Sequence, residues 1–426
     1  MDTVAVYLWG RRVGALNWDA GRRLARFQYD PEFIQTGLEI SPLMMPLSQR
    51  VYQFNDHVDT KTFKGLPGVI ADSLPEKFGN RILDVYLARN GRNIEDLNPL
   101  ERLCYVGSRG MGALEYEPDF DTRDLKKPIP VEVSDLAEVA QAVLADRKAA
   151  DGNLKIDGIE ALVSVGTSAG GAKAKAVIAI NDETKHVLSG QANVPLGYKH
   201  WLLKFDEIEN EEHATSRQIG RIEYAYNEMA TEAGIKTMNC RLLKDGNRAH
   251  FMTERFDRVD GNAKIHVCTF AGIMHVDRDP PGNIGYERLF QVIRDLGLGQ
   301  NSLNEMYRRM VFNICSRNQD DHTKNHAFLM FADGVWQLSP AYDLCFSYKP
   351  GNRFIEQHQM ACNGKRDQFT FEDLKQAAVA ADIKKPEKII DQVQHAIRQW
   401  PDFARKSGIE KKTTIAIGKL HRTFSN

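Results

Sequence analysis

The sequence predicts an α+β fold in which a small β-rich domain precedes a larger domain of two lobes. Three observations lead to this prediction. Residues 3 to about 60 contain short apolar strands separated by turns. A second set of strands, between residues 177 and 253, flanks one amphipathic helix. Helices are predicted at 302–316, from Thr370, and at 388–397 and 413–420, so we expect an all-α C-terminal lobe.

Composition narrows the functional classes. The chain has 426 residues and a net charge of −1, so it offers no overall electrostatic attraction to nucleic acid or to a membrane surface. Its six cysteines include no Cys-x-x-Cys pair, which argues against a zinc site and against a disulfide framework. No apolar run reaches the ~18 residues of a membrane span, and no signal peptide is recognisable. We therefore expect a soluble, cytoplasmic protein.

Domain boundaries follow from composition. Residues 1–120 are predicted to form the N-terminal domain, with strands at 4–9, 13–18 and 24–29 and helices at about 75–89 and 99–105. Prolines and charged residues between Pro118 and Pro130 indicate a linker, and a helix from Ser134 to about Lys148 completes the segment 121–150. Residues 151–426 form the larger domain, with an N-lobe to about 256 and a C-lobe from about 257.

The most informative stretch follows a predicted helix from Ser302 to Ser316. It carries Asp320, then Asn325, then a hairpin formed by residues 327–331 and 335–338, and finally Asp343. Protein kinases use this order of parts, in which one Asp accepts the proton of the substrate hydroxyl while an Asn and a later Asp hold Mg²⁺. Hard oxygen ligands suit that metal. Taken alone, such a spacing is more often a helix end and a turn.

A glycine-rich segment lies far upstream of this stretch, between residues 164 and 176. Its candidate phosphate contacts are Gly166, Thr167, Ser168, Ala169 and Gly170. Glycine and small hydroxyl residues let backbone amides approach phosphate oxygens. The segment is neither a Walker A loop nor Gly-x-Gly-x-x-Gly, and the tip of an ordinary hairpin is the alternative.

Lys204 lies inside the apolar strand 200–205, and a helix from Ser216 to about Ala233 follows. We expect Glu223 on this helix, rather than Glu228, to form the ion pair that orients a nucleotide-binding lysine. Strands at 240–244 and 249–253 then lead into residues 254–257, where a kinase hinge belongs. The joint order of these parts, and no single motif, predicts a protein-kinase-like bilobal fold.

The chain resembles the HipA family of bacterial serine/threonine kinases, the toxin components of HipBA toxin–antitoxin pairs. The resemblance extends over nearly the whole length. The matching segments are residues 70–76, 168–175, 203–204, 254–257, 320–325 and 340–343.

The resemblance implies ATP and Mg²⁺ as cofactors. It assigns Lys204 to the ATP phosphates, Glu254 and Phe256 to the adenine hinge, and His322 and Lys324 to the nucleotide site. It also assigns the catalytic base to Asp320 and the metal to Asn325 and Asp343.

The resemblance further implies regulation and partners. Ser168 matches a loop serine that family members autophosphorylate and thereby inactivate themselves, and Ser164 and Thr167 are neighbouring hydroxyls. The implied partners are a small helix-turn-helix antitoxin of the HipB type, DNA only through that antitoxin, and a protein substrate such as an aminoacyl-tRNA synthetase.

Two other functional classes fit parts of the sequence. A metal-dependent hydrolase would use Asp320, Asp321, His322, His326 and Asp343 around an activated water. It would not need the glycine-rich segment or Lys204. A catalytically inactive interaction protein is the second alternative, although every catalytic position of the kinase pattern is filled. Beyond Asp343, helices are expected from Thr370, as an N-cap paired with Asp373, and at 388–397 and 413–420.

Overall fold

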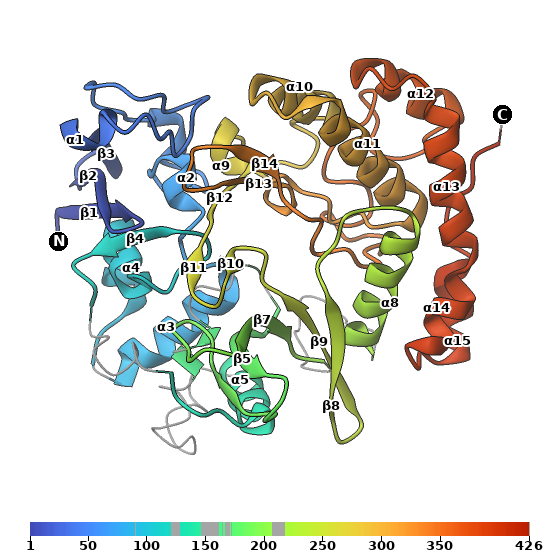
Figure 1. The fold of residues 1–426 in the computed structure, drawn as a ribbon, viewed down its shortest axis with the longest axis horizontal. Coiled ribbons are helices and arrows are strands. Elements are labelled where there is room, and N and C mark those ends of the chain that lie inside the picture. The colour runs from blue at the N-terminus through green and yellow to red at the C-terminus, as the bar shows by residue number, and fades with distance from the viewer. Residues whose placement is uncertain are drawn as a thin grey trace.

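The computed structural model describes residues 1–89, 91–120, 128–145, 162–163, 165–166, 171, 173–206 and 218–425. The four-stranded sheet near the N-terminus and the helices near the C-terminus lie at opposite sides of the molecule (Figure 1). In the ranges that are described, no helix combines the length and the apolar character needed to cross a membrane.

The N-terminal unit, residues 1–120, is built on an antiparallel sheet in the order β3-β2-β1-β4. The predicted strands are present, and a fourth strand returns from far along the chain to pair with β1. The strands are β1 (Thr3–Leu8), β2 (Arg11–Asp19), β3 (Leu24–Tyr29) and β4 (Leu114–Glu117). Along β1, Val4, Val6 and Leu8 are fully buried, which is the alternation expected of a strand with one face on the core.

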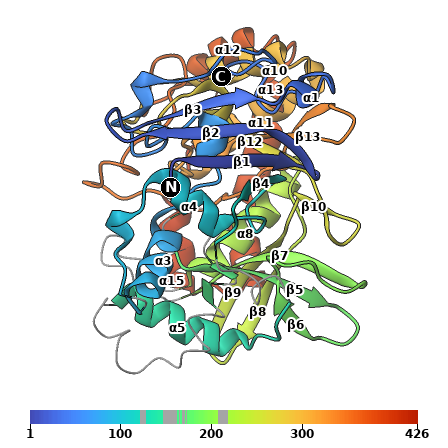
Figure 2. The same cartoon turned by 90° about the vertical axis from the view of Figure 1, so that its left-hand side faces the viewer.

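Helices connect and cover this sheet. They are α1 (Pro31–Ile34), η1 (Asn55–His57), α2 (Gly68–Ala71), α3 (Lys77–Arg89), η2 (Ile94–Asp96) and α4 (Pro99–Val106). Figure 2 looks onto the sheet and shows it in front of the helical part of the molecule, with α3 beside α5 (Val133–Ala145) below it.

The described residues of the predicted N-lobe, between 162 and 256, form the sheet lobe. It contains a five-stranded antiparallel sheet in the order β6-β5-β7-β9-β8. Its strands are β5 (Lys175–Asn181), β6 (Val187–Ser189), β7 (Tyr198–Lys204), β8 (Cys240–Asp245) and β9 (Arg248–Glu254). The predicted turn between β8 and β9 is present. Helix α8 (Ile219–Glu232) packs on β8 and β9, and Gly220 permits this approach because a Cβ there would lie 2.4 Å from the Ala249 carbonyl oxygen.

The helical lobe comprises α9 (Phe270–Met274), α10 (Tyr286–Asp295), α11 (Gly299–Ser316), α12 (Phe371–Ala380), α13 (Pro386–Arg398), α14 (Trp400–Lys406) and α15 (Lys411–Gly418). The predicted capping box of Thr370 and Asp373 starts α12. Helices α9, α10 and α14 were not predicted. Met306, Met310 and Ile314 of α11 are fully buried, and each contributes roughly 1.5–3 kcal/mol to stability through its removal from water.

Two small antiparallel sheets interrupt this lobe. One is the hairpin of β10 (Arg258–Val259) and β11 (Ala263–Lys264), and the other joins β12 (His266–Thr269), β13 (Ala327–Met330) and β14 (Trp336–Leu338). The β13–β14 hairpin is the one predicted after Asn325, with Phe328 opposite Leu338. It carries the chain from the Asp320 loop to Asp343.

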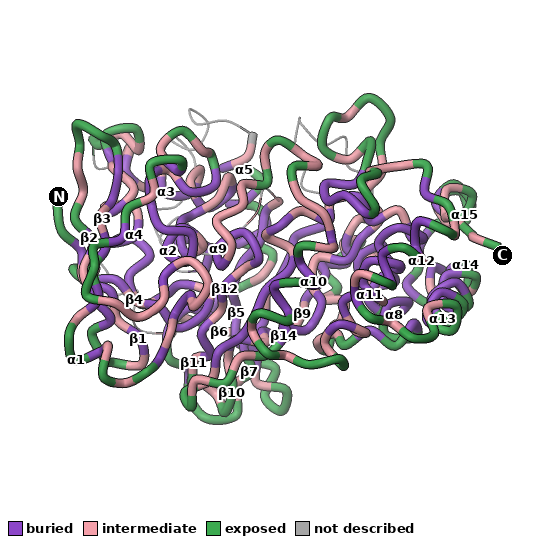
Figure 3. The backbone as a smooth tube through the Cα atoms, turned by 90° about the horizontal axis from the view of Figure 1, so that it is seen from above, coloured by how far each residue is buried: buried purple, intermediate pink, exposed green. Residues whose placement is uncertain are grey.

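One hydrophobic core joins the N-terminal unit to the helical lobe. It extends from Val4 of β1 to Trp400 of α14, and many buried segments lie between the two parts (Figure 3). A second core joins Phe78 and Ile82 of α3 to Ile178 of β5 in the sheet lobe. The N-terminal unit therefore packs on both lobes.

Candidate active site

Lys204 is the last residue of β7, a central strand of the five-stranded sheet. Its side chain is 9% exposed, and its Nζ lies 2.5 Å from Glu223 Oε1 and 2.5 Å from Asp343 Oδ1. A buried ammonium group requires such opposite charges. The expected ion pair with the helix α8 glutamate is therefore present, while Glu228 of the same helix is exposed.

Burial and the neighbouring charges shift the pKa values of Lys204 and Asp343 in opposite directions. Burial lowers the pKa of Lys204, but Asp343 and Glu223 outweigh it and raise that pKa above the ordinary value. Burial likewise raises the pKa of Asp343, but Lys204, with Lys175 and Lys173, holds it well below its usual range. At neutral pH Lys204 is a cation and Asp343 an anion.

Lys175 adds a further positive group from the first residue of β5. Burial and the neighbouring Lys204 lower the pKa of Lys175 to about 8. The sheet lobe thus presents several lysines near the Asp343 carboxylate, as a site for polyanionic phosphate groups requires.

Residues 317–326, the expected catalytic loop, follow helix α11. Arg317 ends the helix in the left-handed conformation with φ 60°, and the loop then makes a short turn, η3 (Thr323–Asn325). The side chain of Asp320 is 45% exposed. Asn325 Nδ2 donates to the Asp320 carbonyl oxygen at 2.8 Å, which joins the two ends of the Asp-x4-Asn motif.

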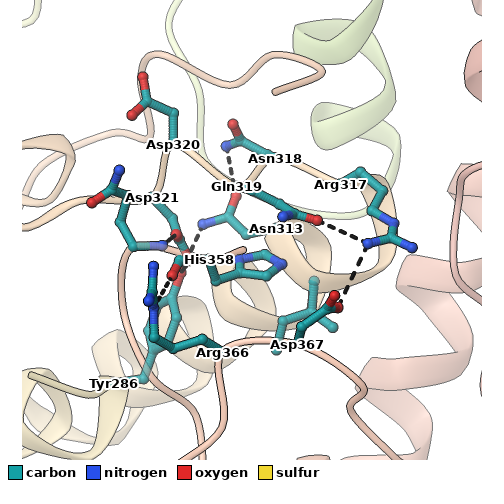
Figure 4. Close-up of polar contacts among 12 residues, drawn as sticks. Tyr286, Asn313, Arg317, Asn318, Gln319, Asp320, Asp321, His358, Arg366 and Asp367 are labelled. Carbon is teal, nitrogen blue, oxygen red and sulfur yellow. Dashed lines mark hydrogen bonds and ion pairs between the residues drawn. The ribbon is translucent and has the colours of Figure 1, made fainter. Parts of the chain in front are cut away.

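Asp321 has a different environment from its neighbour. Its side chain is fully buried and accepts hydrogen bonds from Tyr286 Oη (2.6 Å), His358 Nδ1 (2.9 Å) and the Gln359 backbone N–H (2.8 Å). Burial raises the pKa of Asp321, but His358 and the other donors outweigh it, so the net shift is downward. Figure 4 shows Asp320 directed away from this cluster. Of the two adjacent acids, Asp321 anchors the loop and Asp320 is the accessible one.

Asp343 lies beyond β14 in the left-handed region, with φ 57°. A non-glycine residue adopts this conformation at an energetic cost and often at functional positions. The preceding residue, Tyr342, donates from Oη to the Lys324 carbonyl oxygen at 2.7 Å, so the Asp343 segment is hydrogen-bonded to the catalytic loop.

The donor set fits Mg²⁺. Asp343 offers a carboxylate, and the side-chain nitrogen of Asn325 is used within the loop, which leaves its amide oxygen as the group that could hold a metal. Protein sites for this ion commonly supply one or two such ligands and take the rest from phosphates and water. Within the part of the chain that is described, no group of three His, Cys, Asp or Glu side chains is arranged as a metal site by itself.

The expected hinge residues lie where β9 ends. Glu254 closes β9, and its Oε2 accepts a hydrogen bond from Asn239 Nδ2 at 2.9 Å. The Phe256 ring lies 5.6 Å from the ring of Tyr342, between centroids. Phe256 therefore lies beside the segment that carries Asp343.

Only part of the glycine-rich segment can be placed. Thr167, Ser168, Ala169 and Gly170 lie outside the described residues. Gly166 packs on helix α3, because a Cβ on it would lie 2.6 Å from Ile82 Cδ1.

His322 and Lys324, which are expected at the nucleotide site, lie in the loop of residues 317–326, and Lys324 has a partner that sequence reasoning missed. Its Nζ lies 2.5 Å from Oε1 of Glu76, in the N-terminal unit. Glu76 belongs to the segment 70–76 that carries the family resemblance, which was the available signal. His358, which holds Asp321, was also missed, and nothing in its local sequence indicates that role.

Comparisons with known proteins agree with this architecture. A family model described as HipA N-terminal domain matches residues 4–117, and one described as HipA-like C-terminal domain matches residues 167–400. No curated protein matches the chain.

Among solved structures, the chain is similar to HipA of the Shewanella oneidensis MR-1 toxin–antitoxin system, determined with HipB and its operator DNA. The TM-score is 0.64 at 15% identity, over 98% of this chain and 94% of that chain. The Helicobacter pylori proinflammatory kinase CtkA also matches, with a TM-score of 0.35 at 12% identity, over 52% of this chain and 84% of that one. The two family models together span both the N-terminal unit and the two lobes, and the chain belongs to the HipA family.

Proposed function

We propose that this protein is an ATP- and Mg²⁺-dependent serine/threonine protein kinase of the HipA type. The observation that carries the proposal is the meeting of Lys204, Glu223 and Asp343, which come from a strand, a helix and a distant loop. A strand lysine, its helix glutamate and a metal-binding aspartate are the parts that kinases bring together.

Each residue has a role in this proposal. Lys204 binds the ATP phosphates, and Glu223 keeps Lys204 oriented and charged. Asp320, exposed at the surface of its loop, accepts the proton of the substrate hydroxyl. Asn325 and Asp343 hold Mg²⁺, which when bound neutralises charge on the phosphates. Glu254 and Phe256 contact the adenine at the hinge.

The hydrolase alternative has less support. One of the metal ligands it would need, Asp321, already accepts hydrogen bonds from Tyr286, His358 and the Gln359 backbone N–H. Another, His326, is buried directly before β13, with its ring 5.7 Å from that of Tyr286 between centroids.

The biological role that fits this assignment is that of the toxin of a toxin–antitoxin pair in the cytoplasm. The similar Shewanella protein was determined with HipB and operator DNA, which supports a small HipB-like antitoxin as the partner and DNA contact through it. The protein substrate is of the kind exemplified by aminoacyl-tRNA synthetases. Self-inactivation by autophosphorylation of Ser168 completes the proposal.

Incubation of the purified protein with Mg·ATP tests the function. We expect ATP consumption, nucleotide-dependent thermal stabilisation, and phosphate in the peptide that contains residues 164–168 by mass spectrometry. Lys204→Met should abolish all three, whereas Lys199→Met, an exposed lysine on the same strand, should abolish none. A wild-type protein that neither binds nor consumes ATP would refute the kinase assignment.

A further inference from the structure

We propose that Glu76 is a positioning residue of the active site. Through its ion pair with Lys324, the N-terminal unit holds the catalytic loop that carries Asp320 and Asn325. This inference rests on the proposed kinase function and extends it to a residue outside both kinase lobes.

The ion pair is short and shielded. Glu76 Oε1 lies 2.5 Å from Lys324 Nζ, and the two side chains are only 16% and 13% exposed. Arg278, in the segment between α9 and α10, approaches the other Glu76 oxygen at 3.7 Å. Removing one partner would leave a charge in a poorly solvated place, so the pair strongly favours one loop position.

Lys324 is the middle residue of the turn η3, and hydrogen bonds in its vicinity connect it to Asp320 and to the segment before Asp343. Its carbonyl oxygen accepts from Tyr342 Oη, directly before Asp343. Asn325, the next residue, donates to the Asp320 carbonyl oxygen. A displacement of Lys324 should therefore also displace the proposed base, Asp320. The proposed metal ligands, Asn325 and Asp343, should move with it.

The segment that carries Glu76 is itself hydrogen-bonded to the helical lobe. Four residues earlier in the same segment, Asp72 accepts from both the backbone N–H and Oγ1 of Thr269, at 2.8 Å each. Thr269 is the N-cap of α9 in the helical lobe. Because Asp72 fixes this segment to the helical lobe, Glu76 can act as a fixed point for the loop.

The sequence suggested a different role for Lys324, contact with the nucleotide. In the structure its ammonium group is engaged by Glu76, and the two roles predict different kinetics. A phosphate contact would mainly change the KM for Mg·ATP. A positioning contact would mainly change kcat, because a misplacement of about 1 Å can cost roughly 100-fold in rate.

Hydrogen exchange of the nucleotide-free protein tests the positioning role without relying on activity. We expect Glu76→Gln to accelerate amide exchange in residues 320–326 by about tenfold or more, while exchange in α11 stays unchanged. The control is Glu115→Gln, which breaks another ion pair between the N-terminal unit and the helical lobe, Glu115 Oε1 to Lys264 Nζ at 2.6 Å, away from the catalytic loop. It should leave residues 320–326 unchanged.

Kinetics provide the second readout. Glu76→Gln should lower kcat by roughly 10- to 100-fold with the KM for Mg·ATP within about threefold of wild type. The exchanged pair, Glu76→Lys with Lys324→Glu, should recover part of kcat and restore slow exchange in the loop.

Three results would overturn the inference. They are equal loop exchange in wild type and Glu76→Gln, equal acceleration by Glu76→Gln and Glu115→Gln, and a raised KM with an unchanged kcat. An inactive wild type would refute the proposed kinase function instead, and the exchange comparison would still decide whether Glu76 positions the loop.

Discussion

Two adjacent acids in the catalytic loop, Asp320 and Asp321, should respond to the same substitution in opposite ways. Asp321→Asn replaces a buried carboxylate that accepts three hydrogen bonds with an amide that can accept on one side only. If the amide oxygen faces Tyr286 and His358, the NH₂ group faces the Gln359 N–H. The loss of one or two hydrogen bonds to a charged group should destabilise the fold by ~2–4 kcal/mol.

Asp320→Asn should lower turnover and leave the stability of the fold nearly unchanged. Its side chain is 45% exposed, so the substitution should change the free energy of unfolding by less than ~0.5 kcal/mol. Because an amide cannot accept the substrate proton, turnover should fall ~10² to 10⁴-fold while ATP still binds.

Urea unfolding of both variants, together with ATP consumption at a temperature where both are folded, measures the two effects. The residue assignment would be refuted by an active Asp320→Asn protein beside an inactive but equally stable Asp321→Asn protein. A loss of activity in Asp321→Asn that only follows its unfolded fraction would agree with the anchoring role.

Two further predictions concern the metal and the pH dependence of stability. Asp343→Ala should weaken the binding of Mg·ATP far more than that of metal-free ATP in calorimetry, and equal loss for both would remove Asp343 from the metal site. Burial lowers the pKa of His266 to about 4, below its ordinary ~6.5, so the unfolded state binds a proton that the folded state does not. His266 alone should therefore lower the free energy of unfolding by about 3 kcal/mol as pH drops from 6.5 to 4, and His266→Gln should reduce the total fall by about that amount; an identical pH profile for the variant would contradict it.

Local patterns predicted the elements that local sequence determines. The β13–β14 hairpin, the capping box at Thr370 and the pairing of Glu223 rather than Glu228 with Lys204 all follow from periodicity, turn residues and motif order. These features depend on short separations or on a recurring order of parts, so the sequence carries their signal.

The contacts that place the catalytic loop could not be predicted in the same way. Glu76 and Lys324 are far apart in the chain, and an acidic residue at a helix start has an ordinary local explanation. Likewise, only the fold shows that His358 meets Asp321 while Asp320 remains accessible. Which distant charged residues form an ion pair depends on tertiary packing, and a single sequence does not contain that information.

The N-terminal unit holds the helical lobe at a second place, beside the hinge. Asp257, three residues after β9 ends, accepts from the Gly112 N–H at 2.6 Å and pairs with Arg255 and Arg258 in a buried cluster. Arg258 also donates to the carbonyl oxygens of Gly110 and Gly112 at 3.1 Å each. The unit thus holds the start of the helical lobe here, and the catalytic loop through Glu76.

Its contact with the sheet lobe uses helix α3. Phe78 and Ile82 pack on that lobe through apolar side chains, and the Phe78 backbone N–H donates to the Gly171 carbonyl oxygen at 3.3 Å. Apolar packing and hydrogen bonds therefore join the unit to both lobes.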